Sequence, residues 1–228
     1  IGGSKKHRKN LIKFLSSLSK NNPPLIEMES SEAELVKLFS NSYLAMRVAF
    51  FNELDSFSFE KGLEMKRIIE GISSDPRIGN YYNNPSFGFG GYCLPKDLKQ
   101  LSSQLSSDSS HLIKSIDKSN QARFEFISKK IIDLKPSSVG IYRLQMKSAS
   151  DNFKEAAVIE ILKKILKTRI KVYIYEPLIK DKFYMDTEII NNFEDFIKSS
   201  DLVIANRIDN KIKKSSTKYF TRDLFGEN

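Results

Sequence analysis

Residues 170–175 read Ile-Lys-Val-Tyr-Ile-Tyr, a short run rich in β-branched and aromatic side chains. Similar apolar runs occupy residues 139–142 (Val-Gly-Ile-Tyr) and 202–205 (Leu-Val-Ile-Ala). Segments with helical patterns, at 153–166 and 193–198, separate these runs along the chain. Strands that alternate with helices predict an α/β domain built on a parallel, doubly wound, Rossmann-like sheet.

The carboxyl ends of the expected strands carry cationic side chains. Lys147 follows the first strand, and Asn206-Arg207 follows the last. Ligands of such sheets bind beyond the carboxyl ends of the strands, so these cations would lie where a diphosphate could bind. Taken singly, Lys147 and Arg207 are better explained as surface charges.

The first half of the chain contains one long uninterrupted helical segment. Ser30-Ser31, followed by Glu32, is a favourable helix start, and no glycine or proline occurs before Gly62. Such a helix would be about 40 Å long. Its apolar residues cover more than one stripe, which predicts burial on several sides: Val36, Phe39, Tyr43, Leu44, Val48, Phe51 and Leu54. The helix would form either a subunit interface or the core of a monomer.

Residues 87–97 read Phe-Gly-Phe-Gly-Gly-Tyr-Cys-Leu-Pro-Lys-Asp and contain Cys93, the single cysteine of the chain. Pro95 suits the first turn of a helix that starts beside the sulfur. A thiol at a helix N-terminus next to Lys96 favours the thiolate, which is the nucleophilic form. A lone cysteine is more often a small buried hydrophobe, but these neighbours favour a catalytic role.

The segment Gly88–Asp97 resembles the nucleophile motif G-x-G-G-x-C-x-P-K-D of the UDP-glucose 6-dehydrogenase family. Four further segments resemble other parts of that family, and the resemblance covers nearly the whole chain. They are the long helix 34–53, the substrate loops 75–79 and 82–86, and the C-terminal segments 147–156 and 175–177. The resemblance implies a central helical dimerisation region followed by a UDP-binding α/β domain.

The resemblance also implies an activity, the four-electron oxidation of the C6 alcohol of UDP-glucose to a carboxylate with two NAD molecules. Cys93 would be the nucleophile, Lys37 and Asn41 would stabilise the oxyanion, and Asp97 would position and deprotonate a water. Without the resemblance, Lys37 and Asn41 are a solvent-exposed pair that shares one helix face.

Two further sets of residues match binding positions of the family. The first set is expected to contact the nucleotide sugar: Arg77, Tyr82, Ser86, Phe89, Gly90 and Lys147. Arg77 would make its contact in the site of the partner subunit. Lys96 and Lys154 match cofactor positions. Lys154 replaces the usual arginine and cannot make a bidentate phosphate contact, and Leu98 replaces a usual threonine.

The family pattern places a dinucleotide-binding domain, with its G-x-G-x-x-G turn between a strand and a helix, before the segments found here. This sequence has no such element. We therefore expect residues 1–29, with an amphipathic helix at 8–20, to be the remnant of that domain. The central helical domain is expected at 30–117 and the C-terminal domain at 118–228. The chain alone is expected to be inactive.

The composition fits an enzyme that binds anions. The net charge is +9, with lysines scattered along the chain, which would attract nucleotide diphosphates. One cysteine excludes an internal disulfide, and two histidines, His7 and His111, suggest no metal site. No apolar run has the length of a membrane span and no signal-peptide core is visible, so we expect a cytoplasmic protein without nucleic-acid or membrane partners.

Two alternatives to a UDP-glucose dehydrogenase remain open from the sequence. GDP-mannose dehydrogenases share the cysteine and lysine arrangement, although the loops 82–86 and 90–93 resemble the UDP-glucose branch more closely. A non-catalytic basic module that binds nucleotides or nucleic acid is supported by the net charge alone.

Overall fold

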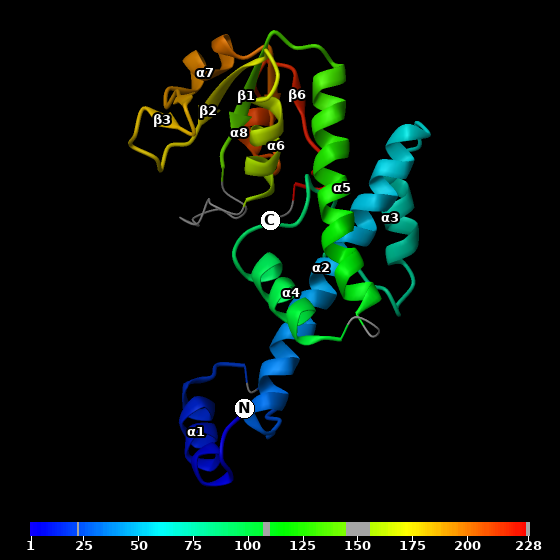
Figure 1. Cartoon of the computed structure of the whole chain (residues 1–228), viewed down its shortest axis with the longest axis vertical. Coiled ribbons are helices and arrows are strands. Elements are labelled where there is room, and N and C mark those ends of the chain that lie inside the picture. Colours follow the sequence, from blue (N-terminus) through cyan, green and yellow to red (C-terminus); the bar gives the residue numbers. More distant parts are fainter. Residues whose placement is uncertain (22, 107–109, 145–155, 227–228) are drawn as a thin grey trace.

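The computed structural model describes residues 1–21, 23–106, 110–144 and 156–226. The helices among them are α1 (Lys5–Leu18), α2 (Ser30–Glu60), α3 (Met65–Ser73), α4 (Cys93–Gln104), α5 (His111–Asp133), α6 (Ala157–Ile165), α7 (Phe193–Ser199) and α8 (Asn210–Lys213). The strands are β1 (Ser138–Tyr142), β2 (Lys171–Tyr175), β3 (Phe183–Tyr184), β4 (Thr187–Ile189), β5 (Leu202–Ile204) and β6 (Tyr219–Phe220). Figure 1 shows the sheet at one end of the molecule and α1 at the other.

The strands form one sheet in the order β3-β4-β2-β1-β5-β6. All neighbouring pairs are parallel except β3 and β4, so the predicted parallel α/β sheet is confirmed, with one antiparallel pair at an edge that the sequence pattern did not predict. Met185 and Asp186, which join β3 to β4, both have positive φ angles (49° and 57°). Two such residues form the tight turn of a hairpin, and this turn reverses the chain after only two residues.

Helices cover both faces of the sheet, which confirms the doubly wound arrangement (Figure 1). On one face, α5 and α6 pack apolar residues such as Ile127 and Leu162 against Ile141. On the other face, α7 and α8 pack Phe196 and Ile212 against Val203. Each face therefore has its own buried core, and the carboxyl ends of β1, β2 and β5 lie between them.

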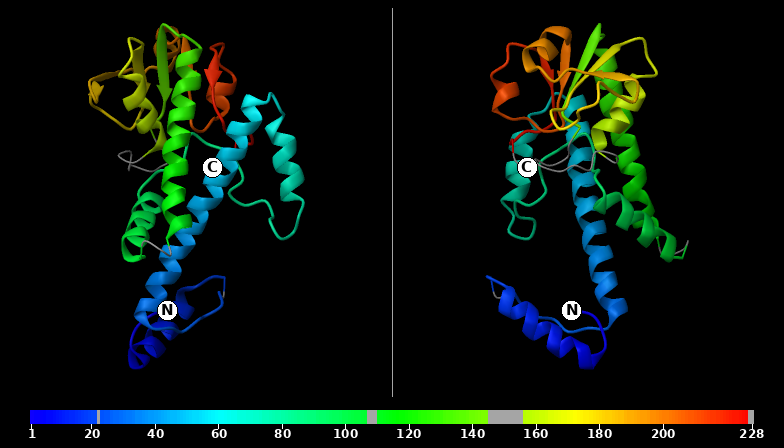
Figure 2. Two further views of the ribbon diagram at one scale, coloured as in Figure 1. Left: turned by 45° about the vertical axis from the view of Figure 1, so that its right-hand side comes forward. Right: turned by 90° about the vertical axis from the view of Figure 1, so that its left-hand side faces the viewer.

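Helix α2 is the long helix expected from the sequence, and it connects the α1 end of the molecule to the α/β end (Figure 2). It begins with a capping box: the Glu29 side chain accepts from the Glu32 backbone amide, and the Glu32 side chain accepts from the Glu29 backbone amide. The prediction of burial on several sides is wrong for the single chain, because several apolar side chains of α2 are exposed: Val36, Phe39, Tyr43, Phe50 and Phe57.

Helix α5 runs without a break through residues 117 and 118, the expected boundary between the central and C-terminal domains. Its first half packs with α2 and α4, and its second half packs on α6. One continuous helix therefore joins the central region to the sheet.

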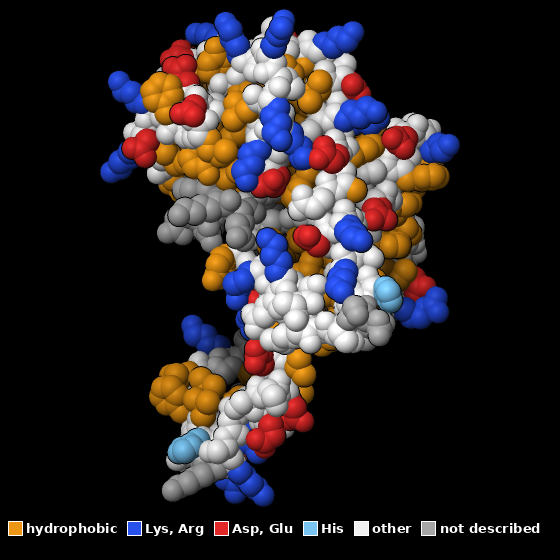
Figure 3. All heavy atoms as spheres, viewed as in Figure 1, with side chains coloured by type: hydrophobic (Ala, Val, Ile, Leu, Met, Phe, Trp, Pro, Cys, Tyr) orange, Lys and Arg blue, Asp and Glu red, His pale blue; other side chains and the backbone are white. Residues whose placement is uncertain are grey.

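Helix α1 is amphipathic, as expected, but its apolar side chains are exposed: Leu11, Phe14, Leu15 and Leu18. Figure 3 shows hydrophobic side chains gathered at the α1 end of the molecule. The ammonium of Ile1 donates to the carbonyl of Ile26 (2.7 Å). This contact joins the residues before α1 to the loop that precedes α2. Among the described residues, no helix has both the length and the apolar character needed to cross a membrane.

Candidate active site

Cys93 is the first residue of α4, and its side chain is exposed. Pro95 lies in the first turn of the same helix, as the sequence predicts. The backbone before the cysteine turns at Gly91, whose φ is +76°. A thiol at this position faces the positive end of the helix dipole and is accessible to a ligand.

Asp97 lies one turn further along α4, and its carboxylate is fully buried. Two side chains of α2 donate to the same oxygen of Asp97: Lys37 Nζ lies 2.6 Å from Oδ2, and Asn41 Nδ2 lies 2.5 Å from it. The ammonium of Lys96 lies 2.9 Å from the other oxygen, Oδ1. Lys37, Asn41 and Asp97 therefore lie in contact. The expected convergence of these three side chains and Cys93 on one reacting carbon stays a prediction.

These contacts determine the charge of the cluster. The Lys37 ammonium is the main cause that holds the pKa of Asp97 at about 2, with Lys96 and Asn41 also lowering it. Asp97 also raises the pKa of Lys96. The carboxylate is therefore ionised at neutral pH and acts as an acceptor, while Lys37 stays a donor beside it.

The segment that leads to Cys93 is buried and lies outside any helix or strand at residues 86–89, and side chains of other elements form hydrogen bonds with its backbone. Asn120, on α5, accepts from the Phe89 amide and donates to the Phe89 carbonyl, both at 2.9 Å. Asn52, on α2, accepts from the Ser86 amide (2.8 Å). Gly88 has a φ of +147°, and a Cβ there would lie 2.3 Å from Phe124. This close approach explains the first glycine of the motif.

A buried ionic cluster contacts the backbone of this segment at Ser86. The Arg123 guanidinium donates to Asp55 Oδ2 (2.6 Å) and, from two nitrogens, to the Ser86 carbonyl (3.0 and 2.8 Å). Arg222, near the C-terminus, also donates to Asp55 Oδ2 (2.9 Å). Burial lowers the pKa of Arg123, and Asp55 opposes this effect. The cluster joins α2, α5 and the C-terminal segment to the backbone of the motif.

The residues expected to contact the substrate have different environments. Tyr82 and Arg77 are exposed, and Arg77 is paired with Asp75 (2.6 Å). Ser86 and Phe89 are buried, with the Ser86 hydroxyl donating to the Gly88 carbonyl (3.1 Å). Gly90, next in the chain, is partly buried. The roles of these residues stay predictions, and Lys147 and Lys154 lie outside the described residues.

Arg207 does not lie free at the carboxyl end of β5. Its guanidinium donates to the Pro85 carbonyl (2.8 Å), and burial lowers its pKa. Arg207 thus contacts the motif segment, and so does its neighbour Asn206, which accepts from the Phe87 amide (2.9 Å). Sequence reasoning missed Asn52, Asn120 and Arg123, and it named Asn206 only as the neighbour of Arg207 at a strand end. The available signal was a polar residue at a core position of a helix or at a strand end.

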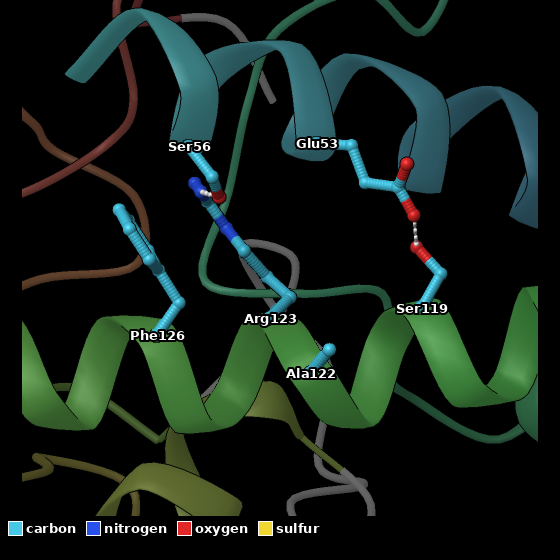
Figure 4. A pocket seen from close by; sticks show the side chains of 6 residues that line it. All are labelled: Glu53, Ser56, Ser119, Ala122, Arg123 and Phe126. Carbon is cyan, nitrogen blue, oxygen red and sulfur yellow. Dashed lines mark hydrogen bonds between the residues drawn. The ribbon is translucent and has the colours of Figure 1, made fainter. Parts of the chain in front are cut away.

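A pocket of about 270 Å³ lies between α2 and α5 (Figure 4). Its lining includes Glu53 and Ser119, which are joined by a hydrogen bond, together with Phe126. None of the four proposed catalytic residues lines it. The candidate active site lies instead at the start of α4, where Cys93 is exposed and Lys37 and Asn41 contact Asp97.

Comparisons with known proteins agree with this architecture. Residues 31–122 match the central domain of the UDP-glucose/GDP-mannose dehydrogenase family, and residues 140–225 match the UDP-binding domain of that family. The chain is 49% identical to a UDP-glucose 6-dehydrogenase of Campylobacter jejuni, over 93% of this chain and 54% of the relative. It is 46% identical to the Streptococcus pneumoniae enzyme of the same name, over 91% and 52% of the two chains. The chain thus spans about half the length of these relatives.

Solved structures give the same fold. A UDP-glucose dehydrogenase from Pyrobaculum islandicum superimposes with a TM-score of 0.79 at 22% identity, covering 95% of this chain and 53% of that one. The fold is the one seen in the nucleotide-sugar dehydrogenases. Within that class, the chain belongs to the UDP-glucose/GDP-mannose dehydrogenase family.

Proposed function

We propose that this chain is the catalytic and sugar-nucleotide-binding part of a UDP-glucose 6-dehydrogenase, which oxidises UDP-glucose to UDP-glucuronate. The observation that supports it most directly is the buried Asp97 carboxylate bound by Lys37 and Asn41, one helical turn from the exposed Cys93. The identity of 49% to a relative of that name supports the choice of substrate.

In the proposed reaction, C6 of the sugar first loses a hydride and a proton to become an aldehyde. The Cys93 thiolate then adds to the carbonyl carbon, the carbonyl oxygen takes up a proton, and the resulting thiohemiacetal keeps the aldehyde bound. Loss of a second hydride from this carbon, together with the proton of its hydroxyl group, gives a thioester. Water adds to the thioester, the C–S bond breaks, and the products are the carboxylate and the Cys93 thiolate.

Lys37 and Asn41 are proposed to stabilise the oxyanion of the tetrahedral intermediates. The Lys37 ammonium carries three donors and the Asn41 amide carries two, and each spends one on Asp97 Oδ2. Both therefore keep donors for a substrate oxygen. Asp97 is proposed to position the water and accept its proton, and its pKa of about 2 favours the positioning role.

NAD is the hydride acceptor proposed for the enzyme. Lys96 is the candidate contact of this chain to the cofactor phosphates, because its side chain is cationic and partly exposed in the first turn of the helix that starts at Cys93. Lys154 was assigned to the same phosphates and lies outside the described residues. The sequence contains no glycine-rich strand-to-helix turn, so these residues offer a contact to the cofactor but no pyrophosphate site. We accordingly propose that the 228-residue chain alone does not turn over.

The remaining proposals follow from the family. Arg77, Tyr82, Gly90 and Lys147 contact the nucleotide sugar, and the buried Ser86 and Phe89 shape the loop that holds it. Two chains pair through α2, whose exposed apolar side chains are otherwise unexplained. The product serves polysaccharide precursor synthesis, such as that of capsules, in the cytoplasm. Neither nucleic acid nor membrane is a partner in this proposal.

GDP-mannose is the second candidate substrate, because the family includes both activities. The identity to a GDP-mannose 6-dehydrogenase of Pseudomonas savastanoi is only 23%, over 86% of this chain and 49% of that relative, which favours UDP-glucose.

The direct test is titration calorimetry of the chain with UDP-glucose and, separately, with GDP-mannose. Heat with UDP-glucose alone supports the proposal. Heat with GDP-mannose alone assigns the chain to the other branch, and heat with neither contradicts a sugar-nucleotide site in this chain. In a full-length enzyme that contains this sequence, Cys93→Ala abolishes NADH production. Unchanged production would remove Cys93 as the nucleophile.

A further inference from the structure

The segment before Cys93 is held by the C-terminal α/β domain as well as by the central helices. Asn206 accepts from the Phe87 amide (2.9 Å), and Arg207 donates to the Pro85 carbonyl (2.8 Å). The contacts extend to residue 84, because Asn84 donates to Asp223 Oδ1 (2.7 Å). Two regions of the C-terminal domain, residues 206–207 and residue 223, therefore meet residues 84–87.

Asn206 occupies a special place among these contacts. It lies two residues beyond β5, at the carboxyl ends of the parallel strands, where sheets of this kind bind their ligands. Its side chain is buried, and so is the Phe87 amide that it accepts from. One side chain thus joins the ligand end of the sheet to the backbone that continues to the proposed nucleophile.

The segment needs such fastening because it is intrinsically flexible. Residues 88–91 include Gly88, Gly90 and Gly91, and glycine restricts the backbone least. The same segment is also held by Asn52 and Arg123 at Ser86, by Arg207 at Pro85, by Asn120 at Phe89 and by the helix that begins at Cys93. Removing the acceptor at Phe87 would leave a buried amide without its partner, and the segment would gain freedom to move in order to satisfy it.

We propose that Asn206 is a positioning residue: through it, the C-terminal domain holds residues 87–93, the Cys93 loop, at a fixed position relative to Lys37 and Asn41. The importance of this role for catalysis rests on the proposed function. The positioning of the loop by Asn206 does not depend on that function, since it concerns only contacts within this chain.

The test compares Asn206→Leu with Asn206→Asp, which keeps an acceptor oxygen for the Phe87 amide. Amide hydrogen exchange reports the freedom of residues 87–93. The rate of alkylation by iodoacetamide reports the accessibility and reactivity of the Cys93 thiol. It is unambiguous because the chain has one cysteine. We expect Asn206→Leu to accelerate exchange over residues 87–91 at least tenfold and to change the alkylation rate at least threefold. Asn206→Asp stays within twofold of the unchanged protein in both.

Asn192→Ala is the matched control. Asn192 caps α7 in the same domain by accepting from the amides of Glu194 and Asp195, so its loss destabilises the domain without touching the loop. We expect a lowered unfolding temperature with unchanged exchange at 87–91 and unchanged alkylation. If Asn206→Leu does not fold, Asn206→Ser, whose side chain is too short to reach the Phe87 amide, replaces it with the same expected result.

Two outcomes would overturn the proposal. Acceleration confined to the Phe87 amide, with normal alkylation of Cys93, would make Asn206 a local contact only. Equal changes in Asn192→Ala would make the effect one of general stability. Because both measurements are made without ligand, an absence of UDP-glucose binding in the calorimetric titration would contradict the proposed substrate without touching this result.

Discussion

The ammonium of Lys37, on α2, lies 2.6 Å from a carboxylate oxygen of Asp97, on α4. The two residues are 60 positions apart in the chain, and the carboxylate is fully buried whereas the lysine side chain is 58% exposed. Much of the Lys37 side chain thus lies in solvent while its ammonium binds a buried anion. This pair fixes the spacing between the two helices that carry the proposed catalytic residues.

Removing the lysine should release the carboxylate. Lys37→Met removes the main cause of the lowered pKa of Asp97, so we expect that pKa to rise from about 2 toward its ordinary value of 3.8. Carboxyl chemical shifts, followed by NMR through a pH titration, measure it. Lys13→Met, on α1, is the control and should leave the titration unchanged. An unaltered Asp97 titration in Lys37→Met would show that the ion pair is absent in solution.

The same carboxylate should make the stability of the chain depend on acid. The folded-state pKa of Asp97 (about 2) lies below the ordinary value of 3.8, so its stabilising contribution is complete above about pH 4. It is lost as the pH falls from about 4 to 2. Urea unfolding between pH 2 and 5 measures this slope. Asp97→Asn should lower stability at pH 7 by about 1.5–3 kcal/mol and should flatten the slope, and an equally steep slope in that variant would assign it to other groups.

Gly88 should tolerate no side chain. Gly88→Ala places a Cβ 2.3 Å from the Phe124 ring at a φ of +147°, and we expect a loss of about 2–4 kcal/mol in unfolding free energy. Gly71→Ala is the control, since Gly71 lies in α3 with nothing within 4 Å of an added Cβ. It should gain about 0.5–1 kcal/mol. Equal effects of the two substitutions, measured by urea unfolding, would contradict the close packing at Gly88.

The buried pairing of Asp55 with Arg123 should be costly to break. Arg123→Met removes the guanidinium and leaves Asp55 with Arg222 as its remaining ionic partner, and we expect a loss of about 3–5 kcal/mol. Arg67→Met is the matched control, because Arg67 forms an exposed pair with Glu64 and should change stability by less than about 1 kcal/mol. A loss at Arg123 as small as that at Arg67 would show that the cluster contributes little.

The exposed apolar side of α2 should mediate self-association. We expect the chain to sediment as a dimer at micromolar concentration, and Phe50→Glu to shift it toward monomer, because the charge would be buried without a partner in the interface. Phe183→Glu, on β3, is an equally exposed control that should stay dimeric. A chain that sediments as a monomer before any substitution would contradict an interface on α2.

Local patterns in the sequence were sufficient for the main elements. The run without glycine or proline before Gly62 predicted α2, and the alternation of apolar runs with helical patterns predicted β1, β2 and β5 with α7. Met185 and Asp186 were missed as a turn because methionine is not a typical residue at positive φ and no glycine follows Asp186. The pair Lys37 and Asn41 was placed on one helix face by its spacing alone, but its role came from a family resemblance.

The sequence by itself determined the helix that starts at Cys93, the shared face of Lys37 and Asn41, and the α/β class of the second half, because each depends on spacing over a few residues. Only the tertiary structure decided which side of α2 is buried and which side chains hold the Cys93 loop. The bond from Asn206 to Phe87 spans 119 residues, and the pair of Arg222 with Asp55 spans 167. Such contacts depend on how the α/β domain packs against α2 and α5, and no local periodicity encodes that packing.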